Sequence, residues 1–480
     1  MKEKSKLISQ EKAFKFDFGY VPRSSAVFYY KYDKNFKTTI IILNYWKLKR
    51  GADVVIFAST RGMSGNLVKR EIIDFKKGMV IQYSPVFEPD EFEGSIEIEV
   101  MSSSNLFIPY SAVTAVYETK KSISAVHSYG RFYSHHEIEE ENMICEGRQS
   151  SITINESKNI KTSFVVHNGN EKLEVQECDL SVQNHRGERK TFKFSLCELK
   201  PYETKKIYLS DVVPELKSFT EGKLAFCSAG LNLKNSVLRY LVCWETNSHD
   251  QIQVTHTDFD YSYFEEEMLK DTICKVISPS VNGEIASVAI HGEFPPGELL
   301  LKKNSDKSKI TIETGKTRFL KSEKVIDIIS NSDLIPSRIH TEFYGDLNNE
   351  TILPFHVSVG AFHSKWPLKR FWWGSVISSK EKNTKILIDE IDFIEGSKSH
   401  ESFTISLYSS SRQDHLRKVI PVEKLEKFTK GVDISEIFPE ACEFLDENFG
   451  YYTLYYEGGN FFVYSLIENS FGSITLEHGF

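Results

Sequence analysis

The chain has 480 residues, of which 40% are hydrophobic, 13% aromatic and 26% charged, and its formal net charge is −8. Because a single hydrophobic core rarely grows beyond about 250–300 residues, this length predicts two to four domains. The composition is that of a globular protein. Basic and acidic residues are interleaved and form no basic footprint, so we expect no nucleic-acid partner.

The N-terminus is polar, from Met1 to Lys6, and no apolar segment follows it. We therefore expect neither a signal peptide nor a membrane-spanning helix. The seven cysteines are widely spaced and never form a CxxC pair. This pattern favours buried, reduced thiols over a disulfide framework or a structural zinc site. Together these features predict a cytoplasmic protein with no membrane partner.

Short apolar runs rich in Val, Ile, Phe and Tyr follow one another along the chain, separated by turn sequences such as Asn168-Gly169-Asn170. Aromatic and β-branched residues favour strands, and regularly spaced short strands are typical of sandwiches and barrels. Helical periodicity is weak, and the best helix candidate is the segment 422–428. We therefore predict an all-β protein.

Four segments of the chain share one order of features, which we interpret as four tandem β-sandwich-like repeats. Each repeat opens with an apolar strand, which a polar turn and a second strand follow in three of the four. The opening strands are 38–44, 162–168, 286–291 and 384–389. The predicted divisions are an N-terminal lead-in at 1–37 and repeats at 38–150, 151–270, 271–370 and 371–480.

Each repeat also ends in a common way, with an aromatic-led strand and then a histidine. The aromatic-led strands are 109–113, 239–243, 354–358 and 463–467, and the closing histidines are His127, His256, His363 and His478. In three repeats a glutamate stands between the two: Glu118, Glu245 and Glu468. The spacing suits a hairpin with the glutamate on one strand and the histidine on its partner, close enough to interact.

The second repeat has further distinctive segments: an apolar strand ending in Asn168-Gly169, a basic strand after Pro201, and a closing Gln253-Val254-Thr255-His256-Thr257. In these features it resembles the sensory rhodopsin transducer family of small β-sandwich domains, although Val254-Thr255 separates Gln253 from His256. The resemblance implies a four-fold ring that binds small molecules such as carbohydrates. A single chain of four repeats would then have a pseudo-four-fold arrangement with its closing histidines facing a shared centre.

Candidate ligand-binding residues gather near the closing histidines. Arg131 follows His127 and can hold an anionic or hydroxyl-rich ligand, while the surrounding charge run also fits an exposed linker. Trp366 belongs to the aromatic and basic segment 362–374, which suits sugar rings or a plugged domain junction. The full candidate set is His127, Arg131, Glu118, Glu245, His256, His363, Trp366 and His478.

A candidate metal site lies at the end of the second repeat. In a strand, His256, Asp258 and Asp260 would point to one face, and a histidine with two carboxylates can bind a divalent metal. The alternative is a solvated strand end in which the aspartates form a turn. A divalent metal therefore stays possible in a protein that we otherwise expect to need no cofactor.

Familiar catalytic signatures are missing from the sequence, including the Walker P-loop, GxGxxG, GxSxG and HExxH motifs. We therefore favour a non-catalytic binding protein for a small polar ligand or carbohydrate at the centre of four repeats. One alternative is a metal-dependent enzyme acting on a sugar or sugar-nucleotide through His256, Asp258 and Asp260, helped by His127 and Glu245. Another is a structural protein that assembles through exposed strand edges.

Overall fold

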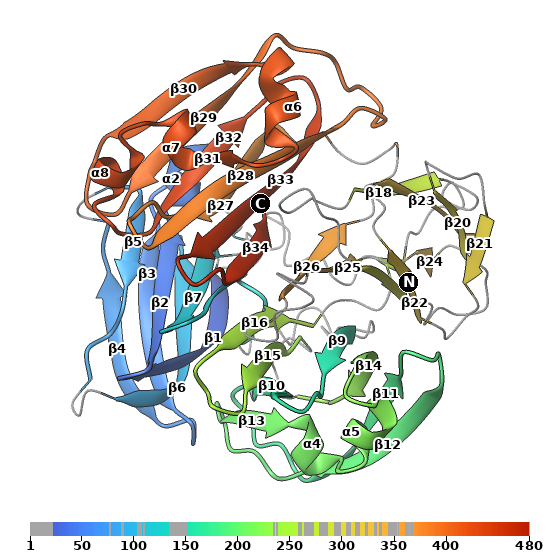
Figure 1. The fold of residues 1–480 in the computed structure, drawn as a ribbon. Coiled ribbons are helices and arrows are strands. Elements are labelled where there is room, and N and C mark those ends of the chain that lie inside the picture. The colour runs from blue at the N-terminus through green and yellow to red at the C-terminus, as the bar shows by residue number, and fades with distance from the viewer. Residues whose placement is uncertain are drawn as a thin grey trace, which may run out of the picture. The chain divides into compact units, whose positions relative to one another are not determined.

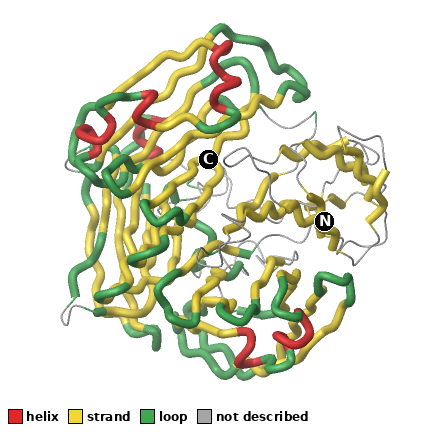
Figure 2. The backbone as a smooth tube through the Cα atoms, viewed as in Figure 1, coloured by secondary structure: helices red, strands yellow, loops and turns green. Residues whose placement is uncertain are grey.

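The computed structural model consists mainly of antiparallel strands, which form several separate sheets (Figures 1 and 2). Contacts divide the chain into two compact units, Met1–Lys120 with Ala125–Thr257 and Lys121–Ser124 with Asp258–Phe480. The prediction of an all-β fold of repeated sandwich-like units is confirmed. The described residues are 23–75, 78–87, 91–102, 108, 111–133, 151–233, 236, 239–257, 262–263, 273–277, 287–291, 299–303, 309–312, 317–321, 325–330, 334–335, 338–343, 353, 355–360, 364 and 368–479.

One sheet topology occurs four times along the chain. In repeat 2 the first sheet has the strand order β12-β11-β14-β9 and the second has the order β13-β10-β15-β16. When the strands of each repeat are counted from one to eight, these orders read 4-3-6-1 and 5-2-7-8. Repeats 3 and 4 have the same two orders. In repeat 1 the two sheets are continuous, because β1 also pairs with β2.

The bounds of the strands and helices follow the repeats. Repeat 1 contains β1 (Arg23–Asp33), β2 (Phe36–Leu43), α2 (Tyr45–Arg50), β3 (Val55–Gly62), β4 (Leu67–Ile73), β5 (Val80–Tyr83), β6 (Phe92–Met101), β7 (Val113–Thr119) and β8 (Ile123–His127). Repeat 2 contains β9 (Ser151–Asn155), β10 (Ile160–His167), β11 (Gln176–Gln183), β12 (Arg189–Leu196), β13 (Thr204–Tyr208), α4 (Leu209–Val212), α5 (Leu216–Thr220), β14 (Leu224–Gly230), β15 (Leu241–Thr246) and β16 (Ile252–His256).

The second half of the chain continues in the same order. Repeat 3 contains β18 (Ile273–Ile277), β19 (Ser287–His291), β20 (Leu299–Lys303), β21 (Lys309–Ile312), β22 (Thr317–Lys321), β23 (Val325–Ser330), β25 (Arg338–Phe343) and β26 (Phe355–Gly360), with a small added pair of β17 (Ser262–Tyr263) and β24 (Leu334–Ile335). Repeat 4 contains β27 (Phe371–Val376), β28 (Lys382–Ile391), β29 (Ser402–Ser409), β30 (His415–Pro421), η2 (Val422–Lys424), α6 (Leu425–Phe428), β31 (Val432–Asp433), α7 (Ile434–Ile437), α8 (Ala441–Leu445), β32 (Gly450–Tyr455), β33 (Asn460–Asn469) and β34 (Ile474–His478).

The segment 1–37, which we expected to be a lead-in, contains the first strand of repeat 1. β1 pairs along its length with β6 and so belongs to the 4-3-6-1 sheet. The sequence alignment began at the second strand of each repeat, because that strand is the most uniformly apolar. The first strands of the later repeats begin at Ser151, Ile273 and Phe371.

A shared threonine contact links the first two strands of three repeats. In each, the threonine hydroxyl bonds both the backbone N–H and the backbone carbonyl of a residue seven positions earlier, at 2.8–3.1 Å. These threonines are the first residues of the apolar segments that the sequence aligned. The pairs are Thr38 with Lys31, Thr162 with Asn155 and Thr384 with Ile377.

The helices are short, each of six residues or fewer in the described part of the chain. The predicted helical segment 422–428 is confirmed as η2 followed by α6. Repeats 2 and 4 each place two small helices between their fifth and sixth strands, a likeness that the sequence pattern did not show. None of these described helices is long and apolar enough to cross a bilayer.

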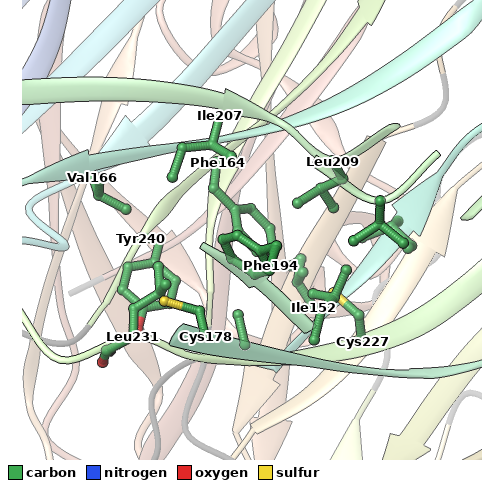
Figure 3. Packing of buried hydrophobic residues seen from close by; sticks show 14 of the residues in the cluster. Ile152, Phe164, Val166, Cys178, Phe194, Ile207, Leu209, Cys227, Leu231 and Tyr240 are labelled. Atoms are coloured by element: carbon green, nitrogen blue, oxygen red, sulfur yellow. Dashed lines mark hydrogen bonds between the residues drawn. The ribbon is translucent and has the colours of Figure 1, made fainter. Parts of the chain in front are cut away.

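The core of repeat 2 lies between its two sheets (Figure 3). Phe164 and Ile207 come from one sheet, and Phe194 and Ile152 come from the other. The edge strand β12 alternates exposed and buried residues, as expected for a strand with one face on the core.

The described cysteines depart in part from the expectation of buried thiols. Cys178, Cys227 and Cys243 are buried, whereas Cys197 and Cys442 are exposed. All five are free thiols. The strand pattern explains the difference at Cys197, because it directly follows the last residue of the edge strand β12.

Gly65 lets repeats 1 and 2 approach each other. Its φ is 85°, and an added Cβ would overlap the carbonyl oxygen of Pro201 and lie 2.9 Å from the amide nitrogen of Glu203. Gly187 has a similar φ of 82°, but no atom lies within 4 Å of its added Cβ.

We expect Gly65→Ala to cost more stability than the matched control Gly187→Ala. Both substitutions carry the left-handed backbone cost of about 1–2 kcal/mol. Gly65→Ala adds an overlap that forces backbone shifts, worth about 1–3 kcal/mol. Urea unfolding of the two variants, with amide hydrogen exchange of residues 202–204, measures the difference. Equal losses in the two variants would contradict the close approach.

Candidate functional site

Three closing histidines occupy one structural position. His127, His256 and His478 are each the last residue of the eighth strand of a repeat. In each case the next residue donates its backbone N–H to a carbonyl near the start of the seventh strand. These bonds are Ser128 to Val113 at 3.0 Å, Thr257 to Tyr240 at 2.8 Å and Gly479 to Val463 at 2.5 Å.

Repeat 3 departs from this pattern. Its eighth strand ends at Gly360, which faces Arg338 as His256 faces Leu241 in repeat 2. The segment 354–358 was predicted to precede the closing strand, but its residues 355–358 belong to that closing strand, so the sequence alignment was one strand out of step here. An apolar run with a leading aromatic does not distinguish the seventh strand from the eighth. His363 and Trp366 lie outside the described residues.

The expected contact between glutamate and histidine within a hairpin is wrong. Glu245 faces Ile252 near the turn, whereas His256 faces Leu241 at the other end of the same hairpin. Four strand residues separate the two ends, which is about 13 Å. Glu468 likewise faces Ile474, near the turn of its own hairpin. Glu118 is half-buried on β7, opposite Lys37 of β2.

Folding instead brings together two histidines from different repeats. The Nε2 atoms of His127 and His256 are 3.1 Å apart, and their rings are nearly perpendicular with centroids 4.6 Å apart. Both side chains are buried, with exposed fractions of 7% and 5%. Since 129 residues separate the two in the chain, only the docking of repeat 1 against repeat 2 makes this pair.

Hydrogen bonds determine which ring nitrogens of His127 and His256 carry protons. His256 Nδ1 lies 2.9 Å from the carbonyl oxygen of Thr257, which can only accept, so Nδ1 carries a proton. In the neutral ring His256 Nε2 is then an acceptor, and His127 Nε2 must donate to it. The Thr257 carbonyl therefore fixes the tautomer of His256, which in turn fixes that of His127.

Two further residues extend the pair into what we call the histidine cluster (His127, Tyr129, His167 and His256). The Tyr129 ring lies parallel to that of His256 at 6.1 Å, and its hydroxyl is 3.0 Å from His167 Nε2. His167 Nδ1 is 2.9 Å from the hydroxyl of Thr204. Burial lowers the pKa of His167 to about 3 and raises that of Tyr129 well above its usual value. These two side chains are therefore neutral at physiological pH.

Sequence reasoning missed His167, Tyr129 and Thr204. His167 ends strand β10 as His127 ends β8 and His256 ends β16. A search for histidines at strand ends would have found it. Tyr129 carried no such signal, because its contact with His167 joins two repeats. Thr204 carried none either, because its contact with His167 depends on the pairing of β10 with β13.

Arg131 is held on the segment that follows His127. Val27 of β1 donates its N–H to Gly130 at 3.0 Å, and the backbone of Phe132 bonds the Ser25 hydroxyl in both directions, at 3.1 and 3.2 Å. Arg131 lies between these two contacts, 7% exposed, with its guanidinium 5.1 Å from the ring centre of Tyr133. A buried guanidinium beside an aromatic face suits recognition of hydroxyl-bearing or anionic groups.

Glu245 takes part in an internal ion pair with Lys206. Tyr208 donates to Glu245 Oε2 at 3.2 Å, and the Lys206 ammonium lies 5.5 Å from the ring centre of Tyr29. Burial by itself would raise the pKa of Glu245, but the charge of Lys206 outweighs it and lowers that pKa. The partner of Glu245 is thus already present in the fold, at the opposite end of the hairpin from His256.

The structure gives limited information on a metal. Asp258 and Asp260, the predicted carboxylate ligands, lie outside the described residues. Across the residues that are described, no group of three or more His, Cys, Asp or Glu side chains is placed to hold a metal ion. His256 Nε2, the predicted imidazole ligand, is directed at His127.

One described pocket lies away from the predicted residues, on repeat 4. Its volume is about 590 Å³. It is formed by the loop 399–401 with the first residues of β29 and η2, and no predicted site residue lines it. The lining residues are Ser399, His400, Glu401, Ser402, Val422 and Glu423.

Comparison with known proteins adds little. No protein-family model matches the chain, and a search of curated proteins finds no match. Among solved structures, one described as a tetra-tandem repeat in the extending region of a large adhesion protein is 9% identical, covering 89% of this chain and 92% of that one. The TM-score is 0.09, too low to show a shared fold. The resemblance of repeat 2 to the sensory rhodopsin transducer family stays a prediction.

Proposed function

We propose that the chain is a non-catalytic binding protein for a small polar ligand of the carbohydrate type, recognised where closing strands of successive repeats meet. The observation that carries the proposal is the 3.1 Å approach of His127 and His256, which hold equivalent positions in repeats 1 and 2. His127 and His256 end equivalent strands of the two repeats, so residues of both repeats could contact one ligand at this junction.

The chemistry of this junction suits a ligand with several hydroxyl groups. Such a ligand needs both donors and acceptors next to apolar ring faces. A ligand that replaced the contact between the two imidazoles would meet ring nitrogens able to donate and to accept, and the Arg131 guanidinium, which donates only. Tyr129 and Tyr133 supply aromatic faces beside them. The rigid tautomers of His127 and His256 would limit the ordering cost on binding.

A sugar and glycan screen on the full chain tests this function, with hits followed by calorimetry. We expect His127→Gln and Arg131→Gln to weaken binding of a hit at least tenfold. The matched control is His415→Gln, because His415 is exposed on β30 of another repeat. A ligand whose affinity is the same for all three variants would place its site elsewhere, and the absence of any hit would count against the function.

A second candidate function, a metal-dependent enzyme acting on a sugar or sugar-nucleotide, rests on one detail of the same pair. His256 donates Nδ1–H to a backbone carbonyl, as metal-bound histidines do. The Nε2 separation of 3.1 Å is near the roughly 3.3 Å between two nitrogen ligands of a tetrahedral zinc ion. Elemental analysis of purified protein and of His127→Gln decides between the candidates. One divalent ion per chain, lost in the variant, favours the enzyme, and metal-free protein rejects it.

A further inference from the structure

The strand β4 stands at the end of the sheet of repeat 1. In the order β4-β3-β6-β1-β2-β7-β8, it pairs on one side with β3, and no other described strand pairs with it. An edge strand presents backbone donors and acceptors that can bind another strand, so proteins commonly protect such edges with charged residues, proline or bulges.

The equivalent edge strands of repeats 2 and 4 are protected in this way. β12 exposes Arg189, Lys190 and Lys193. β30 exposes Arg417 and Lys418, and it ends in a proline. Both strands thus present an excess of positive charge, which opposes pairing with a second copy of themselves.

β4 differs from these two strands in the number of apolar side chains that it exposes, since β30 exposes one large apolar residue, Val419, and β12 exposes none. Leu67, Val68 and Ile72 are 53%, 51% and 64% exposed, and Val55 on the neighbouring β3 is 48% exposed. Four of the ten exposed large hydrophobic residues in the described part of the chain therefore lie on this one hairpin. Leu67 and Val68 lie near the turn of this hairpin, and Ile72 and Val55 lie near its open end. Exposed apolar residues along an edge strand favour pairing with another strand.

The order of residues along β4 indicates which kind of strand could pair with it. The strand reads Leu67-Val68-Lys69-Arg70-Glu71-Ile72-Ile73. In an antiparallel pair of two copies centred on Arg70, each Lys69 faces Glu71 of the other strand, and each Val68, which lies at a bulge in the pairing of β4 with β3, comes opposite Ile72. Opposite charges and apolar residues in directly facing positions stabilise a strand pair. The sequence of β4 is therefore complementary to itself.

The central arginine does not oppose this pairing. The Arg70 guanidinium is 2.7 Å from the Glu99 carboxylate and 5.1 Å from the ring centre of Phe57, both in its own chain. Its charge is thus compensated within each copy, and its side chain is held over its own sheet.

We propose that β4 is a homodimerisation edge, at which two copies of this chain pair antiparallel about Arg70 and join their sheets. The proposal is independent of the ligand-binding function. It gives the alternative of assembly through strand edges a specific strand and register. Because the contact uses the same strand of both copies, it closes on itself and joins only two copies.

A charge swap in the full chain tests the register. Sedimentation equilibrium of the wild type should show a reversible monomer–dimer equilibrium. Lys69→Glu and Glu71→Lys each place two pairs of like charges in facing positions, and each should weaken dimerisation about tenfold. The double variant Lys69→Glu/Glu71→Lys restores both opposite-charge pairs and should dimerise like the wild type. The swap also restores the ion pair of Lys69 with Glu71 within each chain, so circular dichroism of each variant is needed to separate a pairing effect from loss of folding.

A matched pair of apolar substitutions provides the control. Ile72→Lys on β4 should abolish the dimer, whereas Val419→Lys on the equivalent strand β30 should leave it unchanged, although Val419 is 58% exposed. A wild-type chain that stays monomeric at all concentrations overturns the proposal. A dimer that both single charge variants leave intact, or that the double variant fails to restore, also overturns it.

Discussion

Replacing Glu245 with alanine should destabilise repeat 2 by about 3–5 kcal/mol, because it leaves the Lys206 ammonium buried without its counter-charge. The side chains of Lys206 and Glu245 are only 12% and 7% exposed. Burial favours a neutral Lys206, yet the Glu245 charge raises the Lys206 pKa above its usual value. The measurement is urea unfolding followed by hydrogen exchange of β10, β13 and β15.

Two further variants test whether the loss of the ion pair between Lys206 and Glu245 causes this destabilisation. Glu245→Leu combined with Lys206→Met removes both charges and should recover most of the loss, since apolar residues often replace a buried ion pair without cost. Glu198→Ala breaks the exposed pair with Lys172 and should leave stability unchanged, because exposed pairs contribute little. A loss from Glu245→Ala that the double variant does not reduce would argue against the ion pair as its source.

The second large effect is a dependence of stability on pH that arises from His167. Burial lowers the pKa of this histidine from 6.5 to about 3 in the folded protein. Its contribution to stability is therefore fully present above pH 6.5 and is lost as the pH falls below that value. Between pH 7.5 and pH 4.5 the loss amounts to about 3 kcal/mol. His167→Gln keeps polar groups toward Tyr129 and Thr204 without titrating, so it should escape this loss.

Glu156 has the opposite effect on how stability changes with pH. Burial raises its pKa from 4.5 to about 7, so its contribution is present below pH 4.5 and is lost as the pH rises through about 7. The two residues offset each other in the wild type over this interval. His167→Gln should consequently become more stable on acidification, and Glu156→Gln less stable, each by about 3 kcal/mol relative to the wild type.

Urea unfolding of both variants at pH 7.5 and pH 4.5 measures these differences, in which unrelated groups cancel. His415→Gln on the exposed surface of β30 is the control and should behave as the wild type does. A pH dependence of His167→Gln that matches the wild type would show that His167 is not held neutral by burial.

The repeated architecture was largely readable from the sequence. The apolar segments that start at Thr38, Thr162 and Thr384 carry the threonine contact in all three cases. His127, His256 and His478 end equivalent strands. Local patterns carry this information because the two-residue period of a strand records which face is buried. The same patterns failed in repeat 3, where they took the eighth strand for the seventh.

The site was less readable, because its contacts depend on which strands become neighbours. β9 lies beside β14 rather than beside its successor in the chain, and β1 lies beside β6. No local pattern states such a pairing. Glu245 illustrates the difference, since its sequence neighbourhood associated it with His256, whereas the sheet gave it Lys206 as a partner.

By itself, then, the sequence determined an all-β chain of four repeats with a histidine at the close of most of them. The tertiary structure decided that His127 meets His256 and that His167 joins them through Tyr129. It also decided that β4 is left at an edge. The physical reason is one of range: strand formation and burial follow from neighbouring residues, whereas docking between repeats depends on groups more than a hundred residues apart.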